Sequence, residues 1–227
     1  MENFKKLIII SAILLISFTS CKKDKVAQSD KFDINNPVGY FIYVKQQVQA
    51  SDGGTGMLQG LFEFLPEKKI RRHEPTSDGN NSRLLPYEVV NGNVVSLTDS
   101  DLQFTIENGQ VTSNYLHFKT LALLKGAETN QLAGKTFVGT YYKSDKNVLH
   151  QNFFYSFAGK DNKVGAGFTV GTASRTENYS TIGNIGARVA VVGNADLEFM
   201  VLVNGKLEVS YYEKNSDVLY YGSFNQQ

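Results

Sequence analysis

The sequence has no tryptophan, one cysteine, three histidines and four prolines in 227 residues. A single cysteine excludes a disulfide framework, and the histidines lack the close spacing typical of zinc or haem ligands. The two signs of charge nearly balance, because the sequence has 23 Lys plus Arg and 22 Asp plus Glu. This balance excludes the strongly basic field of a non-specific nucleic-acid binder. We therefore expect no metal, no other cofactor and no nucleic-acid partner.

Motifs for common catalytic chemistry are absent as well. The sequence contains no Walker A loop, no Gly-x-Ser-x-Gly and no His-Glu-x-x-His, and its Gly165, Gly167 and Gly171 miss the dinucleotide spacing. Carboxylate pairs such as Glu198 and Glu208 are what any β-protein with this many acids offers, and sequence does not give their separation. We predict that the protein is not an enzyme.

What is present begins with one apolar run near the N-terminus. Lys5 and Lys6 precede Leu7–Phe18, which is followed by Thr19, Ser20 and the only cysteine. The twelve residues of the run reach about 18 Å as a helix, against roughly 30 Å of bilayer hydrocarbon. Residues 1–20 therefore have the layout of a signal peptide and not of a membrane span.

The residues around Cys21 carry a resemblance. Phe18-Thr19-Ser20-Cys21 resembles the lipobox of bacterial lipoproteins, although that family usually has Leu where Phe18 stands. The resemblance implies cleavage by signal peptidase II before Cys21 and fatty acyl chains such as palmitate on that cysteine. The alternative is an ordinary secretory signal that happens to contain a cysteine, which would leave a free thiol in an oxidising compartment.

The sequence after the cysteine bears on location. Lys22-Lys23-Asp24-Lys25 resembles the Cys-x-Lys-acidic signal of some Gram-negative outer-membrane lipoproteins, with a lysine where a second acidic residue is usual. The resemblance implies a lipid-anchored protein of the outer membrane and favours its outer surface over the periplasmic face. The other interpretation is a solvated, charged tether.

The domain organisation follows from composition. Residues 21–37 are polar, lack a period and end in Asn35-Asn36-Pro37, so they are predicted to be a flexible tether. Residues 38–227 are enough for one all-β domain or for two smaller ones with a boundary near 126–132.

Beyond Pro37 the apolar pattern has a period of two, which predicts strands. The predicted strands are Tyr40–Val48, Met57–Phe64, Leu85–Val90, Asn93–Leu97, Leu102–Glu107, Gln110–Phe118, Lys135–Tyr142, Asn152–Phe157, Lys163–Val170, Arg188–Val192, Leu197–Val203, Lys206–Tyr212 and Leu219–Phe224. Residues Tyr115–Lys125 can also be interpreted as a helix.

Three Asn-Gly pairs predict tight antiparallel hairpins, at Asn91-Gly92, Asn108-Gly109 and Asn204-Gly205. A sheet with this many strands must protect its edge strands from pairing with other chains. We therefore expect an antiparallel meander that is closed as a lipocalin-like barrel or stacked as a β-sandwich. The sequence also contains a weak internal repeat, because the residues from Asp101 to Tyr115 resemble those from Asp196 to Tyr211 at an offset of 95 residues. The all-β domain could therefore consist of two related halves in tandem.

A second resemblance concerns the C-terminal half. The glycine and aromatic spacing of 134–142, 153–157 and 163–168 is similar to the opening strands of lipocalin-type barrels and of the barrel lobes of transferrin-binding and factor-H-binding surface lipoproteins. The glycine-rich closing strands of that second family have no counterpart. The resemblance implies a small apolar ligand inside a barrel or a protein partner outside it.

Aromatic doublets recur in the same half, and neighbours in a strand point to opposite faces. We predict that one ring of each doublet, namely Tyr141, Phe154, Tyr211 and Tyr220, lines a ligand pocket. The alternative is that these rings are core and cross-strand pairs only.

One basic cluster, Lys68–His73, lies between Pro66 and Pro75. Flanking prolines and charge on both faces predict an edge strand protected from further pairing. The functional alternative is an anion site in which Arg71 and Arg72 act as fork donors.

Together these observations predict a lipid-anchored envelope lipoprotein whose all-β domain is a non-catalytic binding module for a small ligand or an extracellular macromolecule. The alternative is an accessory subunit docking on an outer-membrane protein complex. A binder should have a cavity inside its barrel, whereas a docking subunit should have a filled core and a large exposed apolar patch.

Overall fold

The computed structural model describes residues 32–49, 53–75, 82–98, 100–191 and 196–227, and these form an all-β fold as predicted. In this part of the chain there is no helix with the length and apolar character needed to cross a membrane. Residues Asp33 to Gln227 belong to one compact unit. The end of the predicted tether is therefore packed with the domain, where Pro37 is buried. Cys21 and residues 1–31 lie outside the described residues.

Sixteen strands are described. They are β1 (Tyr40–Gln49), β2 (Thr55–Leu65), β3 (Lys69–His73), β4 (Ser82–Val90), β5 (Val94–Leu97), β6 (Gln103–Glu107), β7 (Gln110–Ser113), β8 (Phe118–Lys125), β9 (Thr136–Tyr142), β10 (Val148–Phe157), β11 (Lys163–Gly167), β12 (Arg175–Ile182), β13 (Gly186–Ala190), β14 (Leu197–Val203), β15 (Lys206–Glu213) and β16 (Val218–Gln226).

The first eight strands form an antiparallel sheet in the order β7-β6-β5-β4-β3-β2-β1-β8. Strands β1 to β7 are a meander, and β8 returns to pair with β1, with Tyr40 opposite Lys125. The ladder is open between β7 and β8, which are joined by residues 114–117. The ambiguous segment Tyr115–Lys125 is thus a connection followed by a strand, and not a helix.

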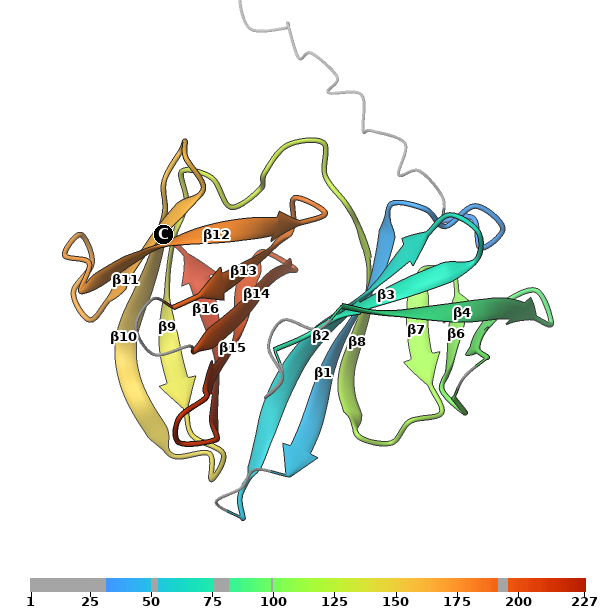
Figure 1. The fold of residues 1–227 in the computed structure, drawn as a ribbon, viewed down its shortest axis with the longest axis horizontal. Helices are drawn as coiled ribbons and strands as arrows, with labels where there is room; N and C mark the ends of the chain where they lie inside the picture. The colour runs from blue at the N-terminus through green and yellow to red at the C-terminus, as the bar shows by residue number, and fades with distance from the viewer. Residues whose placement is uncertain (1–31, 50–52, 76–81, 99, 192–195) are drawn as a thin grey trace, which may run out of the picture. The chain divides into compact units, whose positions relative to one another are not determined.

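Strands β9 to β16 form a closed antiparallel barrel, drawn in yellow to red in Figure 1. Each strand pairs with the next, and the last strand pairs with the first, with Gly222 opposite Tyr141. A barrel of eight strands has an interior just wide enough to be filled by side chains or to hold one small ligand.

The two sheets have the same plan, since in each the eighth strand pairs with the first. The two segments of the predicted repeat form the β6-β7 and β14-β15 hairpins, which are the sixth and seventh strands of their sheets. All three Asn-Gly pairs form the expected tight turns, with φ of 49–53° at Asn and 76–78° at Gly. Local turn chemistry therefore accounts for the β4-β5, β6-β7 and β14-β15 hairpins.

Inside the barrel, alternate residues of every strand pack together. Phe137, Tyr155, Phe157, Met200 and Phe224 are members of this core, and each is almost fully buried. The ring of Phe224 covers two glycines of the wall, Gly139 and Gly222. Such rings over strand glycines replace the packing that a glycine cannot supply.

The outer face of the barrel packs against the first sheet within the same compact unit. Phe41, Tyr43 and Leu61 of β1 and β2 form a buried cluster with Phe199 and Val201 of β14. Burial of apolar area of this kind is worth roughly 25 cal/mol per Å². The cluster explains why the two sheets form one unit.

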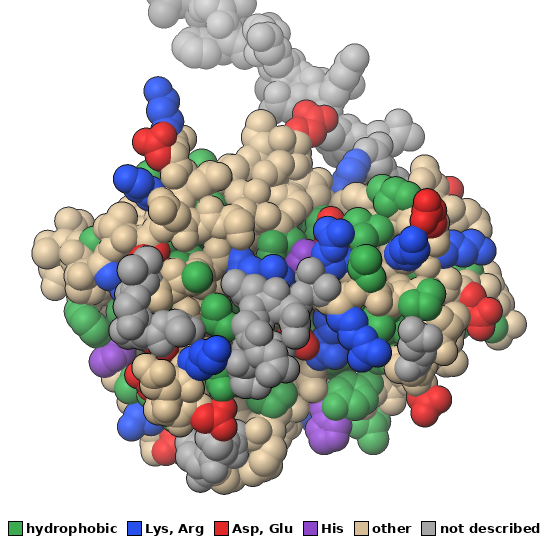
Figure 2. Space-filling model, viewed as in Figure 1, with side chains coloured by type: hydrophobic (Ala, Val, Ile, Leu, Met, Phe, Trp, Pro, Cys, Tyr) green, Lys and Arg blue, Asp and Glu red, His purple; other side chains and the backbone are tan. Residues whose placement is uncertain are grey.

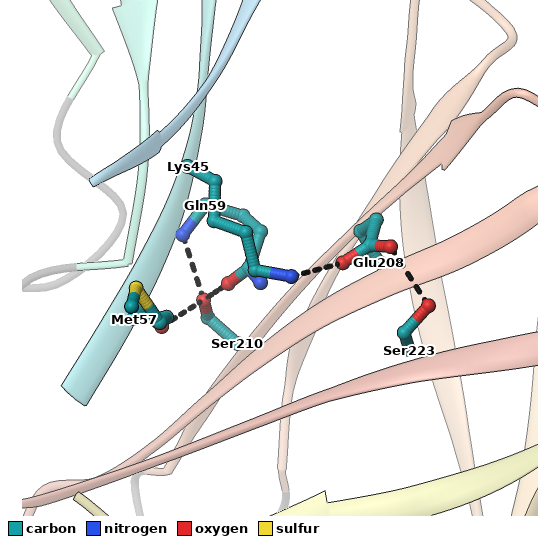
Figure 3. Close-up of polar contacts among 6 residues, drawn as sticks. All are labelled: Lys45, Met57, Gln59, Glu208, Ser210 and Ser223. Carbon is teal, nitrogen blue, oxygen red and sulfur yellow. Dashed lines mark hydrogen bonds and ion pairs between the residues drawn. The ribbon is translucent and has the colours of Figure 1, made fainter. Parts of the chain in front are cut away.

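Polar contacts also join the first sheet to the wall of the barrel, as Figure 3 shows. Lys45 Nζ lies 2.8 Å from Glu208 Oε2, and Ser223 Oγ donates to Glu208 Oε1 at 2.8 Å. The buried Gln59 side chain contacts Ser210 Oγ, which also accepts from the Gln59 backbone N–H at 2.9 Å. These contacts satisfy the backbone N–H and the side-chain oxygen of Gln59, whereas its Nε2 is buried without a hydrogen-bond partner among the described residues.

The prediction that Lys68–His73 forms an edge strand is wrong. Strand β3 pairs with β2 on one side and with β4 on the other. Pro66 and Pro75 lie outside its ladder, so they remove none of the hydrogen bonds that an interior strand needs. Its charged side chains pair with the carboxylates of Glu67, Glu63 and Glu74, and Lys69 and Arg71 also remain exposed to solvent.

Strand β12 was not predicted from the sequence. Its residues RTENYSTI are mostly polar, yet they alternate, and Glu177 and Tyr179 are buried on the inner face of the barrel. The sequence of β12 does alternate between inward and outward residues, but polar side chains such as Glu177 occupy inward positions, where the strand pattern expects apolar ones. Strand β12 is also the strand that carries Arg175.

Candidate functional site

The barrel is filled at one end and hollow at the other. The cavity has a volume of about 350 Å³, which is within the roughly 300–1,000 Å³ typical of small-molecule sites. It is lined by Tyr141, Leu149, His150, Phe153, Phe168, Ser174, Arg175, Glu198, Tyr211, Glu213 and Tyr220.

The topology of the barrel brings these residues together. The cavity lies where β9, β11 and β15 end and where β10, β12, β14 and β16 begin, and in an antiparallel barrel these ends meet at one rim. Toward the other rim, large side chains such as Phe137, Phe157 and Leu207 fill the interior. The cavity is therefore a property of one rim of the barrel.

Aromatic rings form most of the cavity wall. Tyr141 and Phe153 meet edge to face with centroids 5.3 Å apart, and Phe153 meets Phe168 at 5.3 Å. On the other side Tyr211 and Tyr220 are stacked at 5.9 Å. Fixed rings of this kind offer a large apolar contact area to a flat ligand at a low cost in side-chain entropy.

The floor of the cavity is polar. Arg175 Nη2 donates to Glu198 Oε1, and the Tyr155 hydroxyl donates to the same oxygen at 2.7 Å. The hydroxyls of Tyr141 and Tyr155 also form a hydrogen bond with each other. The guanidinium carbon of Arg175 lies 6.0 Å from the centre of the Tyr211 ring, at the limit of a cation–π contact. Arg175 is held in place by both contacts.

The electrostatics of the floor favour neutral phenols and a charged arginine. Burial, followed by the charge of Glu198, raises the pKa values of Tyr141 and Tyr155 well above 10.0. Burial and the hydrogen bond to Asp196 raise the pKa of Tyr211. Burial alone would lower the pKa of Arg175, but attraction to Glu198 outweighs it and raises that pKa. The floor is thus an ion pair surrounded by protonated hydroxyls.

Two polar atoms of this floor are buried without a hydrogen-bond partner among the described residues. They are Arg175 Nη1 and Glu198 Oε2, the second nitrogen and the second oxygen of the ion pair. The side chain of Glu198 is 1% exposed. Buried polar groups are rarely left unpaired, because each costs about 1–3 kcal/mol and more if charged. The ion pair therefore keeps one unpaired donor and one unpaired acceptor, both covered by the surrounding protein.

Three of the four rings selected from the sequence meet at this cavity, namely Tyr141, Tyr211 and Tyr220. Phe154 does not. It is buried on the other face of β10, opposite Gly167 of β11, and its neighbour Phe153 lines the cavity instead. From Phe153 onward β10 pairs regularly with β9, so the two neighbouring rings occupy opposite faces, and the sequence pattern does not decide which of them points inward.

The residues that the sequence did not single out are Arg175 and Glu198. Neither belonged to a motif, and Arg175 lies in the unpredicted strand β12. Glu198 was considered only as a carboxylate partner of Glu208. The two acids lie on opposite faces of the barrel wall, because Glu198 contacts Arg175 inside and Glu208 contacts Lys45 outside.

Arg71 and Arg72 do not converge on one site. As neighbours in β3 they project to opposite faces. Arg71 lies 3.6 Å from Glu63, whereas Arg72 lies 2.6 Å from Glu74 and stacks over Phe62 at 5.5 Å. Arg72 borders a second hollow, of about 520 Å³, in the first sheet. Since each guanidinium already has a carboxylate partner, the pair lacks the uncompensated charge of an anion site.

Among the described residues, no cluster of three or more His, Cys, Asp or Glu side chains is arranged to hold a metal. On the face shown in Figure 2, acidic and basic side chains are interspersed. No protein-family model, no curated protein and no solved structure matches the chain.

Proposed function

We propose that the C-terminal barrel is a non-catalytic binding module that holds a small ligand in the cavity at its open rim. The observation that supports this is the hollow itself: eight strands can be filled completely, yet about 350 Å³ is left open between aromatic walls. The polar floor supplies the few oriented groups that a binding site uses for specificity.

The alternative, a docking subunit, has less support. Such a subunit should expose a contiguous apolar patch larger than a few hundred Å². The large exposed apolar residues are distributed over several places in the described part of the chain: Val38 before β1, Leu84 in β4, Tyr115 and Leu116 between β7 and β8, Val148 at the start of β10, and Phe168 and Val170 after β11. Single exposed apolar residues are normal on protein surfaces.

We also propose where in the cell the protein is located. The resemblance around Cys21 and Lys22–Lys25 supports a lipoprotein anchored in the outer membrane by acyl chains on that cysteine. One acyl chain gives only reversible binding, whereas the two or three of a bacterial lipoprotein hold firmly. The ligand would then be captured by a domain tethered at the cell envelope.

The experiment compares the native and the denatured mass of the protein. Residues 33–227, the compact unit, are expressed in a bacterial host, and their mass is measured under native and under denaturing conditions. We expect a reproducible extra mass that is released on unfolding.

Two matched variants show whether that mass belongs to the cavity. Leu149→Trp fills the cavity and should abolish the extra mass, whereas Val148→Trp, at the neighbouring position that does not line it, should retain it. A bare polypeptide mass from the unmodified chain, also after incubation with a host extract, would contradict the proposal.

A further inference from the structure

The aromatic walls of the barrel cavity suit a positive charge. Five rings of the described residues line it, namely those of Tyr141, Phe153, Phe168, Tyr211 and Tyr220. The face of an aromatic ring is the negative part of its quadrupole, so it attracts a cation within about 6 Å of the ring centre. One cation already lies at this distance, because the guanidinium carbon of Arg175 is 6.0 Å from the centre of the Tyr211 ring.

The charged side chains that line the cavity do not balance. Glu198 is paired with Arg175, and these two charges compensate each other. The other carboxylate of the lining belongs to Glu213, which lies at the end of β15 and is half-buried. Its Oε2 accepts from the hydroxyls of Ser216 at 2.5 Å and Tyr220 at 3.3 Å, and no lysine or arginine among the described residues is paired with it. Glu213 is therefore the uncompensated charge of the cavity.

Negative charge also outweighs positive charge at the phenols of the cavity. Burial is the main cause of the raised pKa of Tyr141, and among the charged groups Glu198 raises that pKa by more than Arg175 lowers it. At Tyr211 burial is again the main cause, and Asp196 raises the pKa by more than Arg175 lowers it. The field in the cavity therefore favours a cation, although Arg175 is part of the lining.

The charge of the ligand follows from what it does to Glu213. A ligand that fills the cavity removes water from this carboxylate. A neutral ligand would leave the carboxylate with neither water nor a counter-charge, and an anionic ligand would add repulsion, so both are costly. A cation supplies the counter-charge, and its attraction to the rings is stronger in a desolvated site than at an exposed one.

The rings also bear on the kind of cation. A primary ammonium brings three N–H donors, and each needs an acceptor when it is removed from water. Ring faces accept hydrogen bonds only weakly, and Glu213 is the one uncompensated carboxylate of the described lining. An ammonium whose nitrogen carries alkyl groups has few or no N–H donors to satisfy and presents apolar groups to the rings.

We propose that the ligand is an alkylated ammonium ion, with its positive group among the aromatic rings of the cavity and with Glu213 as its counter-charge. This inference rests on the proposed function, because it names the ligand class of the same cavity.

The experiment uses four small probes that differ in charge or in N–H donors. Choline carries a trimethylammonium group, neohexanol is its neutral isostere with carbon in place of nitrogen, ethanolamine is a primary ammonium, and the anion of tert-butylacetic acid is negative. Each is titrated into the purified full-length protein by calorimetry at about pH 8, where histidine side chains are ordinarily neutral. We expect choline to bind at least about tenfold more tightly than each of the others, as a desolvated cation–π site should.

Variants connect this preference to the cavity. Glu213→Gln removes the counter-charge, so it should weaken choline binding about tenfold and leave neohexanol binding unchanged. Asp161→Asn is the matched control, because it removes the same charge from an exposed position between β10 and β11, at the opposite rim of the barrel, and it should change neither affinity. If Glu213→Gln fails to fold, Phe168→Leu removes a ring that is 55% exposed, and it should weaken choline binding about threefold.

The outcomes separate the inference from the proposed function. Equal binding of choline and neohexanol, tighter binding of ethanolamine or of the anion, or binding of none of the four overturns the alkylated ammonium ligand. Choline binding that persists in Leu149→Trp, which fills the cavity, would place choline elsewhere and would overturn it as well. None of these results decides whether the cavity holds a ligand, because the copurified mass tests that separately. A bare polypeptide mass would contradict the proposed function and this inference together.

Discussion

Lys45 Nζ lies 2.8 Å from Glu208 Oε2 and joins β1 of the first sheet to β15 of the barrel (Figure 3). The side chains are 23% and 13% exposed, and Glu208 also accepts from Ser223. Lys45→Met should lower the free energy of unfolding by about 1–3 kcal/mol, because it leaves a largely buried carboxylate without its counter-charge. Urea unfolding measures this loss.

The control for that prediction is Lys69→Met. Lys69 pairs with Glu67 at 2.7 Å, but the side chains are 48% and 76% exposed. An exposed pair contributes only about 0–1 kcal/mol. Equal losses in the two variants would contradict a structural role for the Lys45–Glu208 pair.

Inside the barrel, Arg175→Met should lower the free energy of unfolding by about 3 kcal/mol, because Glu198 would stay buried without a positive partner. The double variant Arg175→Met with Glu198→Gln should recover much of this loss, because the uncompensated charge is removed. Chemical denaturation of the two single variants and of the double variant gives the coupling energy. Additive losses would show that the two residues do not act as a pair.

Alkaline pH should destabilise the fold through the buried phenols. The pKa values of Tyr141 and Tyr155 are raised in the folded state, whereas an unfolded tyrosine titrates near 10. Their contribution is therefore complete below about pH 10 and is lost as the pH rises further, because the unfolded chain then releases protons that the folded chain retains. Each phenol contributes a slope of up to about 1.4 kcal/mol per pH unit.

The measurement is the free energy of unfolding between about pH 9 and pH 11, with tyrosinate absorbance followed in parallel. The double variant Tyr141→Phe with Tyr155→Phe should show a shallower alkaline loss than the unchanged protein. An identical slope in the two proteins would mean that other groups cause it.

Gly139→Ala should prevent normal packing of the barrel wall. A Cβ at this position would meet the Ser223 carbonyl oxygen and would lie 2.7 Å from Phe224 Cγ. We expect a loss of about 3 kcal/mol or more in thermal or urea unfolding, since neither the backbone of β16 nor the buried ring can move freely. Gly159→Ala is the control, because a Cβ there meets nothing within 4 Å, and its effect should stay below about 1 kcal/mol.

The lipoprotein hypothesis predicts the fate of Cys21→Ala. Without the thiol no diacylglyceryl group is attached, so signal peptidase II has no substrate. The full-length precursor should accumulate, and acyl labelling should disappear. Detection of a processed, soluble chain from Cys21→Ala would show that an ordinary secretory signal is present instead.

Local signals in the sequence predict most of the fold. The Asn-Gly turns and the two-residue period identify strands such as β14 and β15 because both depend on neighbouring residues only. Strand β12 escaped because Arg175 and Glu177 occupy inward positions that the pattern reserves for apolar residues. The inward polar residue Arg175 of β12 is also one of the residues that line the cavity.

The site itself was predictable in part. The sequence predicts that each aromatic doublet places one ring inward and one outward, but it does not decide which of the two rings points inward. The selection matched the structure at Tyr141, Tyr211 and Tyr220 and missed in β10, where Phe153 lines the cavity and Phe154 lies on the other face. The pairing of Arg175 with Glu198 joins two strands that are not neighbours in the barrel, so only the closed structure brings them together.

The pairing of β16 with β9 also has a consequence for how the barrel is made. Residues Val218–Gln226 supply the missing partner of both β9 and β15. The first strand of the barrel must therefore remain unpaired on one side until the final strand has been synthesised, and contacts of such long sequence separation form slowly. A chain that stops before Val218 would keep two open edges and would be a template for association with other chains.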